Sequence, residues 1–169
     1  LRLEDGREVI LRGIIDRVDL AVIEGKNVAV VFDYKSTARS MNWSRWHYGL
    51  DLQMPAYLLA LQGQRAGGRT VDETAGAFFI PIVAWPSTVS LSGYHPDGQK
   101  VQPFDYKAKG LLNGRYAEYL DKGACGWSRY YNFYVDKEGL PYGSFKVSGA
   151  VRPEQFEKIL SDTESKIRD

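Results

Sequence analysis

Residues 8–35 read EVILRGIIDRVDLAVIEGKNVAVVFDYK, two apolar segments on either side of one turn, and this stretch decides the fold. Residues 8–23 are apolar and β-branched, which predicts two short strands or one bent strand with Gly13 at the bend. Residues 24–27, EGKN, predict a tight turn, because Gly and Asn adopt the positive φ that hairpins need. Residues 28–34 form a nearly continuous apolar run, which is typical of a central strand covered on both faces.

The rest of the chain predicts helices and further strands around this hairpin. An apolar stripe at three- and four-residue spacing predicts a helix over residues 49–64, which begins near Leu52 or bends at Pro55. A similar stripe predicts a closing helix over residues 153–168. We further expect a strand over residues 75–84, irregular structure over 85–109, a short helix over 116–122, and a hairpin of 130–135 with 144–147. This order predicts an α/β (α+β) fold with a mixed central sheet flanked by helices.

The composition excludes several classes of protein. Of 169 residues, 22 are Lys or Arg and 21 are Asp or Glu, so the net charge of +1 gives no bulk-charge argument for nucleic-acid binding. The single cysteine, Cys125, cannot form an internal disulfide. No run of about 18 apolar residues is present, so we expect no membrane span. The chain starts at Leu1 without a methionine, and we expect residues 1–169 to be a single-domain fragment truncated at both ends.

Three charged residues lie within or directly after the apolar strands. Asp16 interrupts the first segment and Asp33 ends the second, where an unpaired carboxylate is costly to bury. With the turn at residues 24–27, residues whose numbers sum to 49–51 lie opposite each other in the hairpin, and those of Asp16 and Asp33 sum to 49. Side chains alternate along a strand, so Asp33 and Lys35 share a face. The sequence thus predicts that two carboxylates and one ammonium group meet at one end of a sheet.

Two carboxylates in such proximity need a compensating charge. At about 4 Å they repel each other by roughly 4 kcal/mol at an effective dielectric constant near 20. A lysine offsets part of this repulsion, whereas Mg²⁺ or Mn²⁺ offsets more and accepts oxygen ligands from both carboxylates. A lysine beside such an ion can position a water molecule and stabilise charge on a phosphate, which favours metal-assisted phosphodiester hydrolysis. A solvated strand edge or a structural ion pair is the alternative for the same three residues. Asp19 has the opposite parity, and we expect it to pair with Arg17 or Arg12 on the other face.

Three motifs, in this order, resemble those of a known nuclease family. Residues 13–19 read GIIDRVD, residues 32–36 read FDYKS, and residues 49–57 read GLDLQMPAY. Together they resemble the G-x-x-D-R-x-D strand, the D-Y-K-S strand and the Q-x-x-x-Y helix of the PD-(D/E)XK nuclease superfamily, RecB/AddB type. The resemblance is closest to the C-terminal nuclease domains of AddB-type subunits in bacterial ATP-dependent helicase/deoxyribonucleases. It implies a restriction-endonuclease-like core, with specific motifs over residues 10–61 and a looser match in the accessory hairpins and closing helix over 85–169.

The resemblance implies a role for each matching residue. Asp16 and Asp33 resemble the metal-binding carboxylates, and the backbone carbonyl of Tyr34 resembles the third protein ligand. Lys35 resembles the catalytic lysine beside the attacking water.

Gln53 and Tyr57 are four residues apart, so they share one helix face. They resemble the pair that borders the family's site and contacts DNA or supports the lysine. A core amide and a packed tyrosine are the alternative for this pair.

The chain departs from the family pattern in two respects. Family members usually supply another acid or histidine from a helix upstream of the first strand, and this chain begins too late to contain that helix. AddB-type domains also carry four cysteines that hold an iron–sulfur cluster, whereas this chain contains only Cys125. The resemblance therefore implies Mg²⁺, or Mn²⁺, as the cofactor here, and a cluster in the full-length protein but not in this fragment.

A basic and aromatic stretch separates Lys35 from the predicted helix. It contains the candidate DNA-binding residues Arg39, Trp43, Arg45 and Trp46. Stacking of bases on tryptophan together with phosphate contacts suits single-stranded DNA. A loop capped by tryptophans of the core is the alternative.

These observations favour a Mg²⁺-dependent exonuclease domain that cleaves strands of unwound DNA during double-strand break repair. The resemblance implies an AddA-like helicase–nuclease subunit as partner and the bacterial cytoplasm as location. A catalytically silent module that binds DNA or braces the same complex is one alternative. A stand-alone CRISPR-associated exonuclease of the same superfamily is another, although such enzymes rely on cysteines that this chain lacks.

Overall fold

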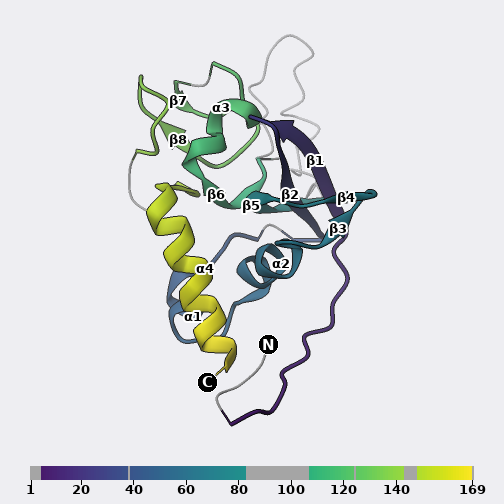
Figure 1. Ribbon diagram of the computed structural model, residues 1–169. Coiled ribbons are helices and arrows are strands. Elements are labelled where there is room, and N and C mark those ends of the chain that lie inside the picture. The colour runs from purple at the N-terminus through teal and green to yellow at the C-terminus, as the bar shows by residue number, and fades with distance from the viewer. Residues whose placement is uncertain (1–4, 38, 83–106, 124, 143–147, 169) are drawn as a thin grey trace, which may run out of the picture.

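Figure 1 shows the computed structural model, which describes residues 5–37, 39–82, 107–123, 125–142 and 148–168. Five strands form one sheet in the order β1-β2-β5-β6-β9, with both parallel and antiparallel neighbours. The strands are β1 (Arg17–Ile23), β2 (Lys26–Lys35), β5 (Glu73–Pro81), β6 (Lys109–Asn113) and β9 (Ala150–Val151). The predicted fold class, a mixed central sheet flanked by helices, is therefore confirmed.

The remaining elements are short hairpins and helices. The hairpins are β3 (Arg65–Ala66) with β4 (Arg69–Thr70), and β7 (Gly126–Trp127) with β8 (Tyr134–Val135). The helices are α1 (Trp43–His47), α2 (Gln53–Leu61), the 3₁₀ turn η2 (Gly114–Tyr116), α3 (Ala117–Leu120) and α4 (Pro153–Arg168). Within the described segments, every helix is too short or too polar to cross a bilayer.

The β1–β2 hairpin has the predicted antiparallel register. Its pairs run from Arg17 opposite Phe32 to Ile23 opposite Lys26, so that paired residue numbers always sum to 49. The turn is shorter than predicted: it consists of Glu24 and Gly25, whose φ angles of 50° and 79° are those of a two-residue turn that matches the twist of the strands. This turn fixes which side chains of the two strands share a face.

The first strand is also shorter than predicted. We expected strand structure from residue 8, but β1 begins at Arg17, and Figure 1 draws residues 9–15 as a coil that rises to it. Leu11 and Ile14 remain 57% and 85% exposed in this segment. A β-branched composition favours a strand only where a neighbouring strand supplies hydrogen bonds and covers the side chains.

Strand β2 lies inside the sheet, between β1 and β5, and is buried on both faces, as predicted. Ala29 and Val31 have no exposed surface, and Phe32 is 7% exposed. Val31 belongs to the hydrophobic core under α2 and α4, whereas Phe32 belongs to the core on the opposite face. Helices α2 and α4 lie together on one side of the sheet (Figure 1), so odd-numbered side chains near the end of β2 point toward α2.

Two helices were predicted with close to their observed extent. Helix α2 begins at Gln53, next to the predicted start, so Pro55 falls in the first turn, where a missing N–H breaks no helical hydrogen bond. Helix α4 buries Phe156, Ile159, Leu160 and Thr163 of its predicted stripe. Helix α1, by contrast, was not predicted; its N-cap Asn42 accepts a hydrogen bond from the backbone of Arg45.

The predictions for the second half of the chain were partly correct. Strand β5 covers most of residues 75–84 and ends at Pro81. Helix α3 lies within the predicted residues 116–122. The chain turns back after Val135, as the hairpin prediction requires, since Val135 forms an antiparallel bridge with Pro141. Strand β8 in addition pairs with β7, which was not predicted. The predicted partner, residues 144–147, and residues 85–106 of the predicted irregular region lie outside the described residues.

Candidate active site

The hairpin brings Asp16 and Asp33 to the same end of the sheet. Asp33 lies on β2 and is 3% exposed, on the face covered by α2. Asp16 directly precedes β1 and stands opposite Asp33 when the observed register is extended by one residue. Its carboxylate Oδ2 accepts a hydrogen bond of 2.8 Å from the backbone N–H of Tyr34. The predicted proximity of the two carboxylates therefore agrees with the geometry.

Lys35 completes this group from the same face of β2. Its Nζ lies 2.5 Å from Asp33 Oδ2, and its side chain is 24% exposed. Asp33 Oδ2 is nevertheless a buried atom that accepts no hydrogen bond of good geometry within the described chain. The contact with Lys35 is thus an ion pair without an aligned N–H, and it leaves this oxygen able to bind a further group.

The first turn of α2 holds the other oxygen of Asp33. Gln53 Nε2 donates hydrogen bonds to Asp33 Oδ1 (3.0 Å) and to the hydroxyl of Tyr57 (2.9 Å). The Tyr57 hydroxyl donates in turn to the backbone carbonyl of Ile14 (3.0 Å), and the Tyr57 ring lies against Gly13. This chain of bonds connects α2 both to Asp33 and to the segment that leads into Asp16. A Gln–Tyr pair was predicted on one helix face, and the structure brings Gln53 to Asp33 and Tyr57 to Gln53.

The donor set fits a hard divalent cation. Two carboxylates and nearby backbone carbonyls are oxygen donors, which Mg²⁺ and Mn²⁺ prefer. The buried Asp33 Oδ2 without a hydrogen bond is the atom that such an ion would satisfy. In the part of the chain that the structure describes, no group of three or more His, Cys, Asp or Glu side chains could hold a metal. An ion at this place therefore depends on two carboxylates, backbone oxygen and water, which is typical of Mg²⁺.

The candidate DNA-binding stretch divides into two parts. Trp46 donates from Nε1 to Thr163 Oγ1 of α4 (2.8 Å), and Trp43 packs edge-on against it at 5.9 Å between ring centroids. Arg45 donates to the backbone carbonyl of Leu50. These contacts place α1 against the core, as in the alternative interpretation of the stretch, and a DNA contact by these three residues stays a prediction.

Arg39, in contrast, lies near the carboxylates. Its guanidinium forms an ion pair with Asp51 (3.2 Å) and lies over the ring of Phe79. Sequence reasoning missed Asp51 and Phe79. A signal for Asp51 was present in its position two residues before Gln53, whereas Phe79 is recognisable only from the pairing of β5 with β2.

The opposite face of the hairpin carries a separate ion pair. Arg17 donates two hydrogen bonds of 2.7 Å to Asp19, which confirms the predicted pairing. The bonds to Asp19 raise the pKa of Arg17 above its usual value. The guanidinium also lies over the ring of Phe32. Both charges are therefore compensated within the pair, in contrast to the carboxylate oxygen Oδ2 of Asp33.

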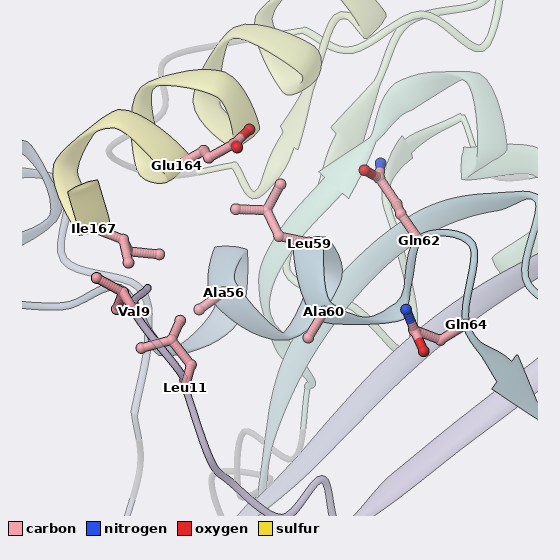
Figure 2. Close-up of a pocket in the computed structure, with 9 residues that line it drawn as sticks. All are labelled: Val9, Leu11, Ala56, Leu59, Ala60, Gln62, Gln64, Glu164 and Ile167. Atoms are coloured by element: carbon pink, nitrogen blue, oxygen red, sulfur yellow. The ribbon is translucent and has the colours of Figure 1, made fainter. Parts of the chain in front are cut away.

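A hollow of about 450 Å³ lies elsewhere, between residues 9–11, α2 and the end of α4 (Figure 2). Its lining includes Val9, Leu11, Leu59 and Ile167, and contains none of the candidate site residues. Among the described residues that line it, Glu164 carries the sole charge. This hollow therefore offers no cation for a phosphate and is distinct from the candidate active site.

Comparison with known proteins agrees with the geometry. Residues 1–160 match the family profile of the PD-(D/E)XK nuclease superfamily. The AddB subunit of the ATP-dependent helicase/deoxyribonuclease of Lysinibacillus sphaericus is 30% identical over 149 residues, which cover 82% of this chain and 12% of the relative. Proteins of the same name match from Oenococcus oeni (29% identical; 98% of this chain, 15% of the relative) and Oceanobacillus iheyensis (46%; 65% and 10%). The chain thus spans 10–15% of the length of these curated relatives. A profile match over almost the whole chain shows that it belongs to the PD-(D/E)XK nuclease superfamily.

Proposed function

We propose that this chain is the nuclease domain of an ATP-dependent helicase/deoxyribonuclease and that it hydrolyses phosphodiester bonds of DNA. One observation carries the proposal: within the described residues, the buried Asp33 Oδ2 accepts no hydrogen bond of good geometry, although Lys35 lies 2.5 Å away and Asp16 stands across the hairpin. The names of the relatives support DNA as the substrate. A catalytically silent DNA-binding or structural module is less well supported, because such a module has no need for a buried carboxylate oxygen without a hydrogen bond.

The cofactor we propose is Mg²⁺, with Mn²⁺ as a substitute. Members of the superfamily generally use divalent metal ions. Asp16, Asp33 and the backbone carbonyl of Tyr34 would hold the ion. When bound, a divalent ion supplies Lewis-acid stabilisation of the negative charge on the reacting phosphate.

Lys35 acts on the water and the phosphate. An ammonium group has three N–H donors, and its ion pair with Asp33 leaves donors for an attacking water and a phosphate oxygen. The side chain is three-quarters buried, so its charge is only weakly screened by solvent. Lys35 therefore orients the water and stabilises the charge that develops on the phosphate.

Gln53 and Tyr57 act as positioning residues. The amide of Gln53 holds Asp33 Oδ1, so that Oδ2 faces the site. Tyr57 fixes the Gln53 amide at one end and the backbone of Ile14 at the other. Helix α2 thereby holds the Asp33 carboxylate directly and the segment before Asp16 through the backbone of Ile14, as residues that orient metal ligands do.

We propose the partner, the form of the substrate and the location from the names of the relatives and from DNA as the substrate. The chain works as a single nuclease domain beside an AddA-like helicase–nuclease subunit, and it receives single strands from unwound DNA in the bacterial cytoplasm. An iron–sulfur cluster, if the complete protein carries one, takes its thiolates from cysteines beyond this chain, since Cys125 is the sole cysteine here.

The test is a separation of cleavage from unwinding in the complete protein with its partner subunit. Lys35→Ala and Asp33→Ala are each expected to abolish Mg²⁺-dependent strand cleavage and to leave ATP-driven unwinding intact. Asp19→Asn is the control, because it removes a carboxylate from the opposite face of the same hairpin. Cleavage that persists in both site variants would refute the proposed function.

A further inference from the structure

Arg39 is held in place by a carboxylate that is itself nearly buried. Its Nη2 lies 3.2 Å from Asp51 Oδ1, and the side chain of Asp51 is 9% exposed, whereas that of Arg39 is 42% exposed. Asp51 lies two residues before α2 and therefore two residues before Gln53. Arg39 is thus fixed at one end of its guanidinium and open to solvent over the rest.

The ring of Phe79 places this guanidinium beside the metal-binding carboxylates. Phe79 on β5 is the register partner of Asp33 on β2. The guanidinium carbon of Arg39 lies 4.9 Å from the centroid of the Phe79 ring, and Lys35 Nζ lies 5.6 Å from the same centroid. The two cations therefore share one aromatic side chain, which is buried and cannot move away from either of them.

Arg39 keeps N–H donors for a DNA phosphate beside its ion pair with Asp51. Lys35 and the proposed divalent ion offset the three negative charges of Asp16, Asp33 and Asp51, whereas a DNA strand brings further negative charge that needs donors of its own. Lys35 balances one carboxylate and is committed to Asp33. A guanidinium has five N–H donors in a planar fork that matches two phosphate oxygens, and the described contact with Asp51 Oδ1 uses one of these donors, on Nη2.

From this geometry we infer that Arg39 is a phosphate-binding residue of the active site, positioned by Asp51 and Phe79. The inference rests on the proposed function. Arg39 binds a backbone phosphate of the DNA strand at or next to the bond that is cleaved, while Lys35 acts on the reacting group itself. Asp51 is a positioning residue that sets the direction of the fork and does not touch the substrate.

The experiment compares Arg39→Ala, Arg39→Lys and Asp51→Asn in the complete protein with its partner subunit. Arg69→Ala is the matched control, because it removes one arginine from the β3–β4 hairpin. Two quantities are measured: kcat and KM for cleavage of a single-stranded oligonucleotide, and the salt dependence of oligonucleotide binding in a Lys35→Ala background, where the DNA stays intact.

Arg39→Ala is expected to lower kcat/KM by about 10- to 100-fold, because a bidentate contact to a charged oxygen is lost. It is also expected to reduce the slope of log K against log salt by about 0.7, the value for one phosphate contact on a single strand. Arg39→Lys should restore the salt slope but only part of the cleavage, since an ammonium group keeps the charge and loses the fork. Asp51→Asn should keep the salt slope and lower cleavage less than Arg39→Ala does.

Two results would overturn the inference. One is an Arg39→Ala variant whose cleavage and salt slope equal those of Arg69→Ala. The other is equal loss of thermal stability and cleavage in Arg39→Ala and Asp51→Asn with no change in salt slope, which would make the pair purely structural. Either result differs from failure of the proposed function. The proposed function fails if cleavage persists without Lys35, whereas these two results concern Arg39 in a protein whose cleavage requires Lys35.

Discussion

Strands β2 and β5 carry two lysine–carboxylate pairs, at opposite ends of the sheet, and the two differ in how well the carboxylate is satisfied. At one end, Glu73 accepts hydrogen bonds from Lys26 and from the hydroxyl of Tyr116. At the other end, Asp33 is more deeply buried, yet among the described residues its Oδ2 accepts no hydrogen bond of good geometry and has the ion pair with Lys35 as its compensation.

The comparison separates a structural ion pair from a reactive one. The hydrogen bond from Lys26, and to a lesser extent that from Tyr116, lowers the pKa of Glu73. The negative charge of Glu73 is therefore stabilised by neighbouring groups of the fold. Burial and the bond to Glu73 raise the pKa of Tyr116 in turn. A lysine and a carboxylate thus contribute to stability at one end of the sheet. At the other end, the same two kinds of charged group leave a buried carboxylate oxygen able to bind a ligand.

The largest expected difference between the two ends is in catalysis. Asp33→Asn removes the charge that binds the cation and is expected to lower cleavage by at least about 10³-fold, since the metal supplies several kcal/mol to the transition state. Glu73→Gln, the equivalent change at the other end, should leave cleavage within about twofold of wild type, because Glu73 bonds Lys26 and Tyr116 and none of the candidate site residues among the contacts described. Steady-state cleavage by both variants in the complete protein checks this. A comparable loss in Glu73→Gln would remove the distinction between the two ends.

The next expected difference is in metal affinity without any reaction. Calorimetric titration of Mn²⁺ into the protein without DNA should show at least about tenfold weaker binding for Asp16→Asn and Asp33→Asn, because each removes one of the two charged ligands. Glu73→Gln should bind Mn²⁺ like the wild type. If Mn²⁺ binds equally well to all three variants, the ion lies at another place.

A smaller effect is expected from the residues that hold Asp33 Oδ1. Gln53→Ala should lower cleavage by roughly 10- to 100-fold, the usual loss for a partner that orients a metal ligand. Tyr57→Phe should lower it less, because Gln53 still bonds Asp33. Gln62→Ala, at the other end of α2, is the control. At saturating Mg²⁺, the cleavage rate should be lowest for Gln53→Ala, intermediate for Tyr57→Phe, and close to wild type for Gln62→Ala.

The local part of the site could be predicted from the sequence. A two-residue turn at Glu24 and Gly25 fixes the register of the whole hairpin, so the opposition of Asp16 and Asp33 follows from residue numbers alone. The Gln53–Tyr57 pair needs only helical spacing. Each of these relations depends on residues close together in the sequence, and for that reason the sequence pattern could predict it.

The remaining contacts depend on which distant segments meet. The approach of Phe79 to Asp33 depends on the parallel pairing of β2 with β5, for which no turn sets the register. Trp46 donates a hydrogen bond to Thr163, which lies 117 residues later in the chain. The sequence around Trp46 therefore could not show whether its ring packs against α4 or stacks on DNA bases. The composition of residues 9–15 likewise predicted a strand, because composition does not tell whether a neighbouring strand is present.

The smallest expected effect is the contribution of Glu73 to stability, and its pH dependence has a definite sign. Because the pKa of Glu73 is lowered in the folded state, its contribution is complete above the unfolded value of about 4.3 and is lost as the pH falls through the folded value. Glu73→Gln should therefore lower the free energy of unfolding by about 1 kcal/mol at pH 7, where two bonds to a charged acceptor are weakened. The difference from wild type should shrink as the pH falls below about 4, because protonated glutamate and glutamine then make similar bonds. Urea unfolding at pH 7 and pH 3 measures it, and an equal difference at both values would mean that the charge of Glu73 contributes nothing.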